Sequence, residues 1–148
     1  MKITATFSHL FLQGDGNTPF AVDGPFLTEE ERLTIAEFMK DLGEGKPLRG
    51  KNKPSWVNDD HEDIPGSEAY KDLNYWHYHC GTTWNEATFK GMTIDLKFNP
   101  NGMHSNECIH YIKESDSKIT IVGYSREHVP FLSPNDKRNP FFSDDEEE

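Results

Sequence analysis

The sequence predicts an α+β fold in which one main helix packs on one face of a mostly antiparallel sheet of four to five strands. Several segments alternate apolar and polar side chains, as strands do, and one segment repeats apolar side chains at helical spacing. With 148 residues, 34% of them hydrophobic and 12% aromatic, the chain is long enough to bury one core. We therefore expect a single domain over residues 1–131 and an irregular acidic tail over residues 132–148.

The alternating segments are the expected strands. In the first of them Ile3, Ala5 and Phe7 alternate with polar neighbours, and a polar turn at residues 114–117 predicts a hairpin between the last two. Residues 44–66 and 84–89 show no such pattern and are expected to be loops. The predicted strands cover residues 2–12, 73–80, 90–98, 106–113 and 118–125.

One helix is expected over residues 28–42. Thr28 is a good N-cap, and Glu31 three residues later completes a capping box. Gly43 is expected to end the helix. An apolar stripe at helical spacing should pack against the sheet, and it consists of Ile35, Phe38, Met39 and Leu42.

Composition limits the classes of function. With 26 acidic and 15 basic side chains the net charge is -11, which opposes undirected binding to nucleic acid, and we expect no DNA partner. No apolar run is long enough to span a bilayer, and no signal-peptide pattern follows Met1, so no membrane partner is expected. Cys80 and Cys108 are too few for a disulfide framework. These features predict a reduced, cytoplasmic, acidic protein.

The aromatic and histidine-rich segment 73–81 is the most distinctive part of the chain. As a strand it places Tyr75, His77 and His79 on one face and Trp76 and Tyr78 on the other. Two imidazoles on one face indicate a polar, titratable surface. The alternative is that they are half-buried structural residues of the sheet.

A metal site is a further interpretation of the histidines. It would combine His77 and His79 with His110 and His128, because imidazole is a good zinc ligand. The spacing of the last two is not diagnostic of such a site. We therefore expect no bound metal.

Basic side chains are concentrated in a loop ahead of this segment. An aromatic side chain, Trp56, follows them, and such a loop can bind a phosphate backbone and stack a base. Alternatively, its charges balance the acidic patch that follows at residues 59–63. The candidate RNA-binding residues are Lys46, Arg49, Lys51 and Lys53.

A second group of candidates lies at the end of the last predicted strand, where Tyr124, Arg126 and His128 follow one another closely. Cleavage of RNA by attack of the 2′-hydroxyl needs a base, an acid and cations that stabilise the phosphorane. Histidine can take either proton-transfer role near neutral pH, and arginine offers a bidentate contact to phosphate. The candidate catalytic residues are therefore His79, His77, Arg126, His128 and Tyr124.

Three short blocks resemble the RelE/ParE toxin superfamily, and within it the YafO-type ribosome-associated mRNA interferases. They read HYH at residues 77–79, SNECIHY at 105–111 and ITIVGYSREH at 119–128, and the resemblance covers about residues 28–131. It implies a RelE-like fold and cleavage of RNA without metal or cofactor. It also implies that Arg126 holds phosphate, that His128 is a catalytic histidine, and that the lysines of residues 46–53 form the basic loop.

The resemblance also implies the partners, which are RNA, either free or on the ribosome, and a cognate antitoxin. A different class of function stays open. The acidic composition and tail fit a non-enzymatic binding protein, such as an immunity protein, an antitoxin or a phage-encoded inhibitor, that masks a basic nucleic-acid-binding or ribosomal site. Its exposed aromatic side chains would then form the interface.

Overall fold

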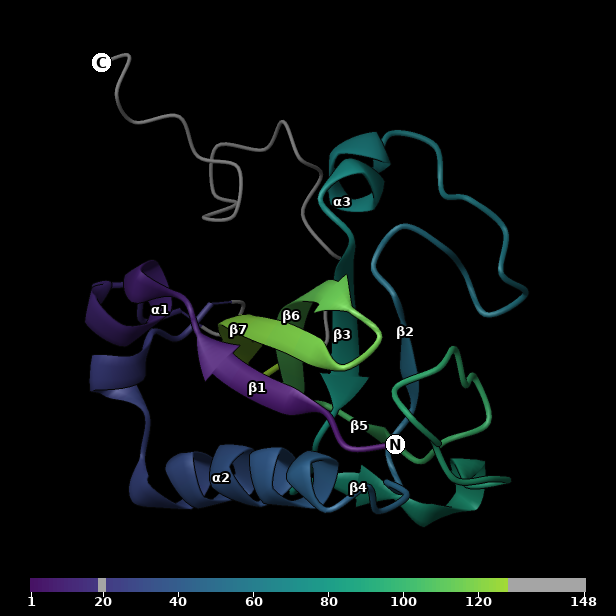
Figure 1. Ribbon diagram of the computed structural model, residues 1–148, viewed down its shortest axis with the longest axis horizontal. Coiled ribbons are helices and arrows are strands. Elements are labelled where there is room, and N and C mark those ends of the chain that lie inside the picture. The colour runs from purple at the N-terminus through teal and green to yellow at the C-terminus, as the bar shows by residue number, and fades with distance from the viewer. Residues whose placement is uncertain (19–20, 128–148) are drawn as a thin grey trace.

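A computed structural model describes residues 1–18 and 21–127 of the chain. In this part of the chain the fold is α+β, with a five-stranded sheet in the order β1-β7-β6-β3-β2 and helix α2 along one face (Figure 1). The sheet is mixed, because β1 runs parallel to β7 while the other three neighbouring pairs are antiparallel. The predicted α+β class is therefore confirmed, with one parallel pair at the sheet edge, and the RelE-like form of the fold stays a prediction.

The longest elements of the described chain are helix α2, with 15 residues, and strands β6 and β7, with eight residues each. The strands of the main sheet are β1 (Thr4–Phe7), β2 (Asn52–Pro54), β3 (Tyr75–His79), β6 (Cys108–Ser115) and β7 (Lys118–Ser125). A separate two-stranded sheet joins β4 (Trp84–Asn85) to β5 (His104–Ser105). The helices are α1 (His9–Gln13), α2 (Glu29–Gly43) and α3 (Glu68–Asp72), with 3-10 turns at Gly24–Phe26 and Glu86–Thr88.

Helix α2 begins as the sequence predicts. The Thr28 hydroxyl accepts a hydrogen bond from the Glu31 backbone N–H at 3.1 Å, and the Glu31 carboxylate accepts one from the Thr28 N–H at 2.8 Å. The predicted apolar stripe faces the sheet, since Ile35, Phe38 and Leu42 are buried. The helix extends through Gly43. The chain turns only after it, at Gly45, whose φ is 71° and therefore left-handed.

The core lies between α2 and the sheet and contains a buried polar contact. The Tyr111 hydroxyl of β6 donates to Asn52 Oδ1 of β2 at 2.7 Å. Asn52 in turn donates from Nδ2 to the backbone carbonyl of Leu96 at 3.0 Å. All three residues are fully buried, so this contact fixes the 94–97 turn against the edge of the sheet.

Two predicted strands are wrong in whole or in part. Residues 9–13 form helix α1 rather than the end of a strand, because the Ser8 hydroxyl caps it by accepting from the Phe11 N–H at 3.1 Å. Residues 90–98 contain no named strand, although they alternate in polarity. Asp95 and Leu96 have φ of 55° and 52°, in the left-handed region, which reverses the chain there and breaks the alternation. Strand β2 occupies the sheet edge instead.

The remaining predicted strands are confirmed, β7 with its predicted bounds and β3 and β6 with shifted ends. The hairpin of β6 and β7 forms around residues 116–117. Strand β3 begins at Tyr75 rather than at residue 73, because α3 precedes it and Asn74 adopts a left-handed φ of 59°. The predicted tail, residues 132–148, lies outside the described residues. In the part of the chain that is described, no helix combines the length and the apolar character that crossing a membrane requires.

Candidate functional site

Strand β3 divides its side chains between two faces of the sheet, as predicted. Tyr78 points toward α2, where its ring stacks on Phe38 with centroids 4.9 Å apart. His77 and His79 lie on the opposite face and are only 2% and 0% exposed. The two imidazoles are therefore buried on the side of the sheet away from α2.

The strands beside β3 extend this polar face in two rows. Lys53 of β2 pairs with His77, which pairs in turn with His110 of β6. In the next row the His79 N–H donates to the Lys51 carbonyl at 2.9 Å, and His79 pairs with Cys108. We call these two rows the histidine–lysine face. Strand register thus brings two of the predicted basic residues beside both predicted histidines.

Each buried imidazole on this face has a polar neighbour. His77 Nδ1 lies 3.1 Å from Ser55 Oγ, and His110 Nε2 lies 2.7 Å from Ser125 Oγ. His79 Nδ1 lies 2.8 Å from the Ser105 carbonyl oxygen. Because a carbonyl can only accept, Nδ1 of His79 is the donor of that contact.

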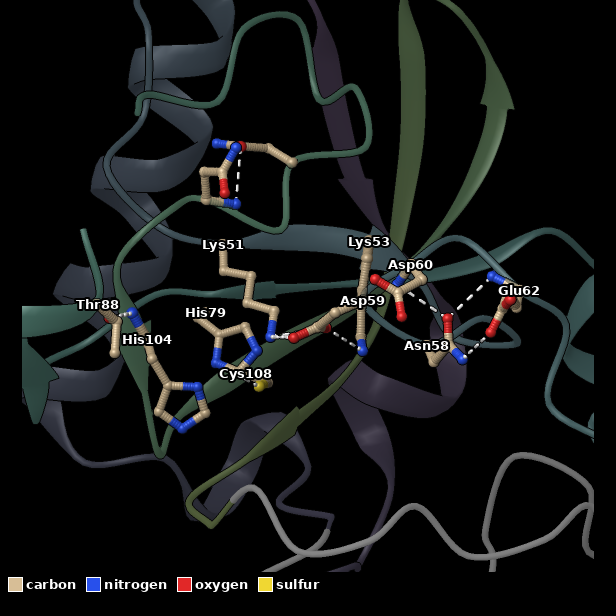
Figure 2. Close-up of polar contacts among 12 residues, drawn as sticks. Lys51, Lys53, Asn58, Asp59, Asp60, Glu62, His79, Thr88, His104 and Cys108 are labelled. Atoms are coloured by element: carbon tan, nitrogen blue, oxygen red, sulfur yellow. Dashed lines mark hydrogen bonds and ion pairs between the residues drawn. The ribbon is translucent and has the colours of Figure 1, made fainter. Parts of the chain in front are cut away.

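Asp59 joins the two lysines of the face. Its Oδ1 accepts from Lys51 Nζ at 2.9 Å and from Lys53 Nζ at 2.8 Å, as Figure 2 shows. The lysine side chains are 13% and 14% exposed, whereas that of Asp59 is 55% exposed. Partial burial opposes ionisation of Asp59, but the hydrogen bonds from the two ammonium groups outweigh it and lower the pKa to about 2. The carboxylate is therefore ionised throughout the neutral range.

The loop that presents Asp59 is organised by Asn58. Its Oδ1 accepts from the backbone N–H groups of Asp60 and Glu62, both at 2.9 Å, and its Nδ2 donates to the Glu62 carboxylate at 3.0 Å (Figure 2). His61, inside the loop, has a φ of 64°. These contacts form an Asx-type turn that holds its own shape.

His104 of β5 adds an imidazole that the sequence analysis did not single out. Its ring centroid lies 4.7 Å from that of His79, and its backbone N–H donates to Thr88 Oγ1 at 2.8 Å. Unlike His79, it is only partly buried. Burial and the nearby charge of Lys51 lower its pKa, so the ring is largely neutral at pH 7 and able to accept a proton. No local pattern marks His104, because its strand has only two residues.

Tyr124 and Arg126 do not join the histidine–lysine face. Tyr124 is 2% exposed within the core, and burial raises its pKa well above its ordinary value. Arg126 donates from Nε to Glu31 Oε2 at 2.7 Å and from Nη2 to the Phe26 carbonyl at 3.1 Å. The predicted grouping of Arg126 with His77 or His79 is therefore not found, and its guanidinium is bound at the start of α2. His128 lies outside the described residues.

A β-bulge explains where Tyr124 points. The pairing of β6 with β7 shifts between His110 and Tyr111, which face Gly123 and Ile121. In the pairing of β6 with β7, Val122 is therefore the extra residue of the bulge. The extra residue changes the phase of the strand, so that both Ile121 and Tyr124 are in the core while Ser125 reaches His110.

The predicted basic loop is divided between several places. Lys46 is exposed and pairs with Glu44 at 2.9 Å. The Arg49 guanidinium lies over the Trp84 ring, 5.9 Å from its centroid. Of these four basic residues, only Lys51 and Lys53 lie beside His77 and His79 in the sheet.

This face also carries possible metal ligands and a buried thiol. Within residues 1–18 and 21–127 no three His, Cys, Asp or Glu side chains are placed to hold a metal ion together. Cys108 Sγ lies 3.7 Å from His79 Nδ1, but complete burial raises the pKa of this thiol far above its ordinary value. It is therefore protonated at neutral pH and is a poor nucleophile.

Comparisons with models of known protein families, with curated proteins and with solved structures found no match. A functional proposal for this chain therefore depends on its own geometry and on the short sequence blocks described above.

Proposed function

We propose that the protein is a metal-independent endoribonuclease of the RelE/ParE type, an mRNA interferase of a toxin–antitoxin system, and that the histidine–lysine face is its active site. One observation carries the proposal. Lys51 and Lys53 converge on a single carboxylate, beside a pair of imidazoles whose rings are 4.7 Å apart. Cations and proton-transfer groups thus meet in one place, as cleavage through the 2′-hydroxyl requires.

In this mechanism Lys51 and Lys53 bind the scissile phosphate and stabilise the negative charge of the phosphorane. His104 is the partly exposed, neutral imidazole, and it removes the proton of the 2′-hydroxyl. The 2′-oxygen then bonds to phosphorus, the bond from phosphorus to the 5′-oxygen breaks, and a 2′,3′-cyclic phosphate forms. The leaving 5′-oxygen takes a proton, which either ammonium group can supply.

His79 is assigned a positioning role rather than direct contact with RNA. It is completely buried, and its Nδ1 contact with the Ser105 carbonyl at 2.8 Å fixes the ring beside His104. A fixed neighbour holds the His104 imidazole in one orientation. Arg126, which the resemblance assigns to phosphate, instead binds Glu31 and Phe26 in this structure.

The test compares cleavage of RNA, free and on translating ribosomes, by the wild type and by His104→Ala. Removing a positioned proton-transfer group should slow cleavage about 10²–10⁴-fold. His9→Ala, the same change at an exposed histidine of α1, is the matched control and should cleave at the wild-type rate. Cleavage should also persist in EDTA. A wild-type protein that neither cuts RNA nor arrests bacterial growth would contradict the proposal.

A second function is favoured by one observation, which is that Asp59 already pairs with both lysines while Asp60 and Glu62 beside it are exposed. An acidic binding protein that masks a basic nucleic-acid-binding or ribosomal site would present such a surface, and the net charge of -11 agrees with it. High-level expression without growth arrest, together with salt-sensitive binding to a basic partner, would favour this function over the nuclease.

A further inference from the structure

We propose that Asp59 occupies the phosphate position of the histidine–lysine face, so that the 58–62 loop closes this site until the backbone of an RNA displaces it. The inference rests on the proposed function, because it takes Lys51 and Lys53 as the phosphate-binding pair. It adds an autoinhibitory contact that is built into the chain.

The contact has the form expected for a phosphate substitute. Both carboxylate oxygens of Asp59 lie 2.9 Å from Lys51 Nζ, and Oδ1 also lies 2.8 Å from Lys53 Nζ. Two oxygens of a phosphate can make the same charge-assisted hydrogen bonds to two ammonium groups. The lysine side chains are less than one-sixth exposed while Asp59 is in place, at 13% and 14%. An RNA phosphate therefore reaches them only after the carboxylate has moved.

The loop is built as a unit that can move without losing its own structure. Besides the side-chain contacts of Asn58, the Asn58 N–H donates to the Glu62 carbonyl at 2.9 Å. At its base the Ile64 N–H donates to the Trp56 carbonyl at 2.8 Å. Among the described residues its tip meets the rest of the molecule through the Asp59 ion pairs and through the His61 ring, whose centroid lies 4.6 Å from that of Phe98. Opening the loop breaks these contacts and leaves the sheet intact.

The size of the effect follows from the balance between open and closed loops. A ligand that binds only the open form has its apparent affinity reduced by the fraction of molecules that are open. The lowered pKa of Asp59, about 2 against an ordinary 3.8, means that the ionised carboxylate favours the closed contact by up to roughly 10²-fold more than a neutral side chain would. Solvent screens a carboxylate that is 55% exposed, so we expect a gain of about tenfold when it is removed.

The experiment measures equilibrium binding of a short RNA whose 2′-hydroxyls are methylated, so that it binds without being cleaved. Asp59→Asn should bind about tenfold more tightly than the wild type. Asp60→Asn changes the net charge equally in the same loop, and within the described residues Asp60 forms no ion pair with either lysine. It should change the affinity less than about twofold. The gain should disappear when Lys51→Ala and Lys53→Ala are added.

A second variant tests the loop rather than its charge. Asn58→Ala removes the side chain that organises the turn and leaves the net charge unchanged, so it should also tighten RNA binding. Wild-type or weaker RNA binding by Asp59→Asn would overturn the inference, and the same result for Asn58→Ala would overturn the part that assigns closure to the 58–62 loop.

The outcomes separate this inference from the proposed function. Tighter binding by Asp59→Asn without cleavage by any variant would support the closed site and reject the nuclease. Cleavage by the wild type, with unchanged affinity and rate in Asp59→Asn, would support the nuclease and reject the closed site.

Discussion

The two faces of the central sheet are both buried, yet they are built from opposite kinds of side chain. On the α2 face Tyr78 and Tyr111 pack against Phe38, and on the other face His77 and His79 occupy the same strand β3. Tyr78 is 4% exposed and His79 is 0% exposed, so burial does not distinguish the faces. The difference lies in what satisfies the buried groups. Ring packing dominates on the α2 face, where the Tyr111–Asn52 hydrogen bond is a buried polar contact, whereas hydrogen bonds and ion pairs dominate on the other face.

The two faces therefore contribute differently to the stability of the fold and to its function. Burial of apolar surface stabilises a fold, whereas burial of polar groups costs free energy unless they are hydrogen-bonded. Serine hydroxyls and a carbonyl contact the imidazoles of the histidine–lysine face. These hydrogen bonds offset the free-energy cost of burying the imidazoles but add little net stability. Such a face is better explained by a chemical function than by stabilisation of the fold. The predictions below test this contrast.

The largest effect is expected on the α2 face. Phe38→Ala removes a ring that contacts both Tyr78 and Tyr111 and should lower the free energy of unfolding by about 3–5 kcal/mol, through lost burial and the cavity left behind. Leu33→Ala, on the same helix but 63% exposed, should change it by less than about 0.5 kcal/mol. Denaturant unfolding of both variants measures the contrast. A loss below about 1 kcal/mol in Phe38→Ala would mean that this face is not the main source of stability.

The next effect concerns the polar contact inside the apolar core. Tyr111→Phe removes the hydroxyl that donates to Asn52 Oδ1 at 2.7 Å and leaves that oxygen buried without its donor. The free energy of unfolding should fall by about 1–3 kcal/mol. In an Asn52→Ala background the same change should cost much less, and a double-mutant cycle of denaturation curves measures this. Equal losses in both backgrounds would contradict the coupling.

Local patterns predicted the parts of the fold that depend on local interactions. The capping box at Thr28 and Glu31 and the apolar stripe of α2 identified the helix, and the polar turn before Lys118 identified the hairpin. Residues 90–98 misled the prediction because their alternation coincides with a left-handed turn at Leu96, which is fixed by the distant Asn52. Such a contact between residues far apart in sequence has no local signature.

The candidate site was only partly predictable, because contacts between distant residues also shape it. The period of a strand placed His77 and His79 on one face, but strand register brought Lys51 and Lys53 to them. The bulge opposite His110 directs Tyr124 into the core, and Glu31 holds Arg126 at α2. Neither outcome follows from the spacing of residues, and the same is true of the contacts of His104 and Asp59.

A smaller effect is expected on the histidine–lysine face. Ser125→Ala removes the hydroxyl that lies 2.7 Å from His110 Nε2, and the free energy of unfolding should fall by about 0.5–1.5 kcal/mol. Denaturant unfolding measures the loss. A loss above about 3 kcal/mol would show that this face supports the fold as strongly as the α2 face does.

The smallest effect is expected at Arg126, whose side chain links the end of β7 to the start of α2 through its ion pair with Glu31. Partial burial opposes ionisation of Glu31, but hydrogen bonds from Arg126 and from Thr28 outweigh it and lower its pKa below the usual 4.5. A lowered pKa in the folded state contributes stability that is present above pH 4.5 and is lost as the pH falls through the folded pKa.

Because the Arg126 side chain is 36% exposed, Arg126→Gln should cost only about 0.5–1 kcal/mol at pH 7. The difference between wild type and variant should shrink toward zero in acid, as the pH falls through the folded pKa of Glu31. Arg32→Gln, at an exposed arginine of the same helix, should show no such pH dependence. Denaturation curves at pH 7 and in acid decide the matter, and a difference that persists unchanged in acid would place the role of Arg126 elsewhere, for example in its bond to the Phe26 carbonyl.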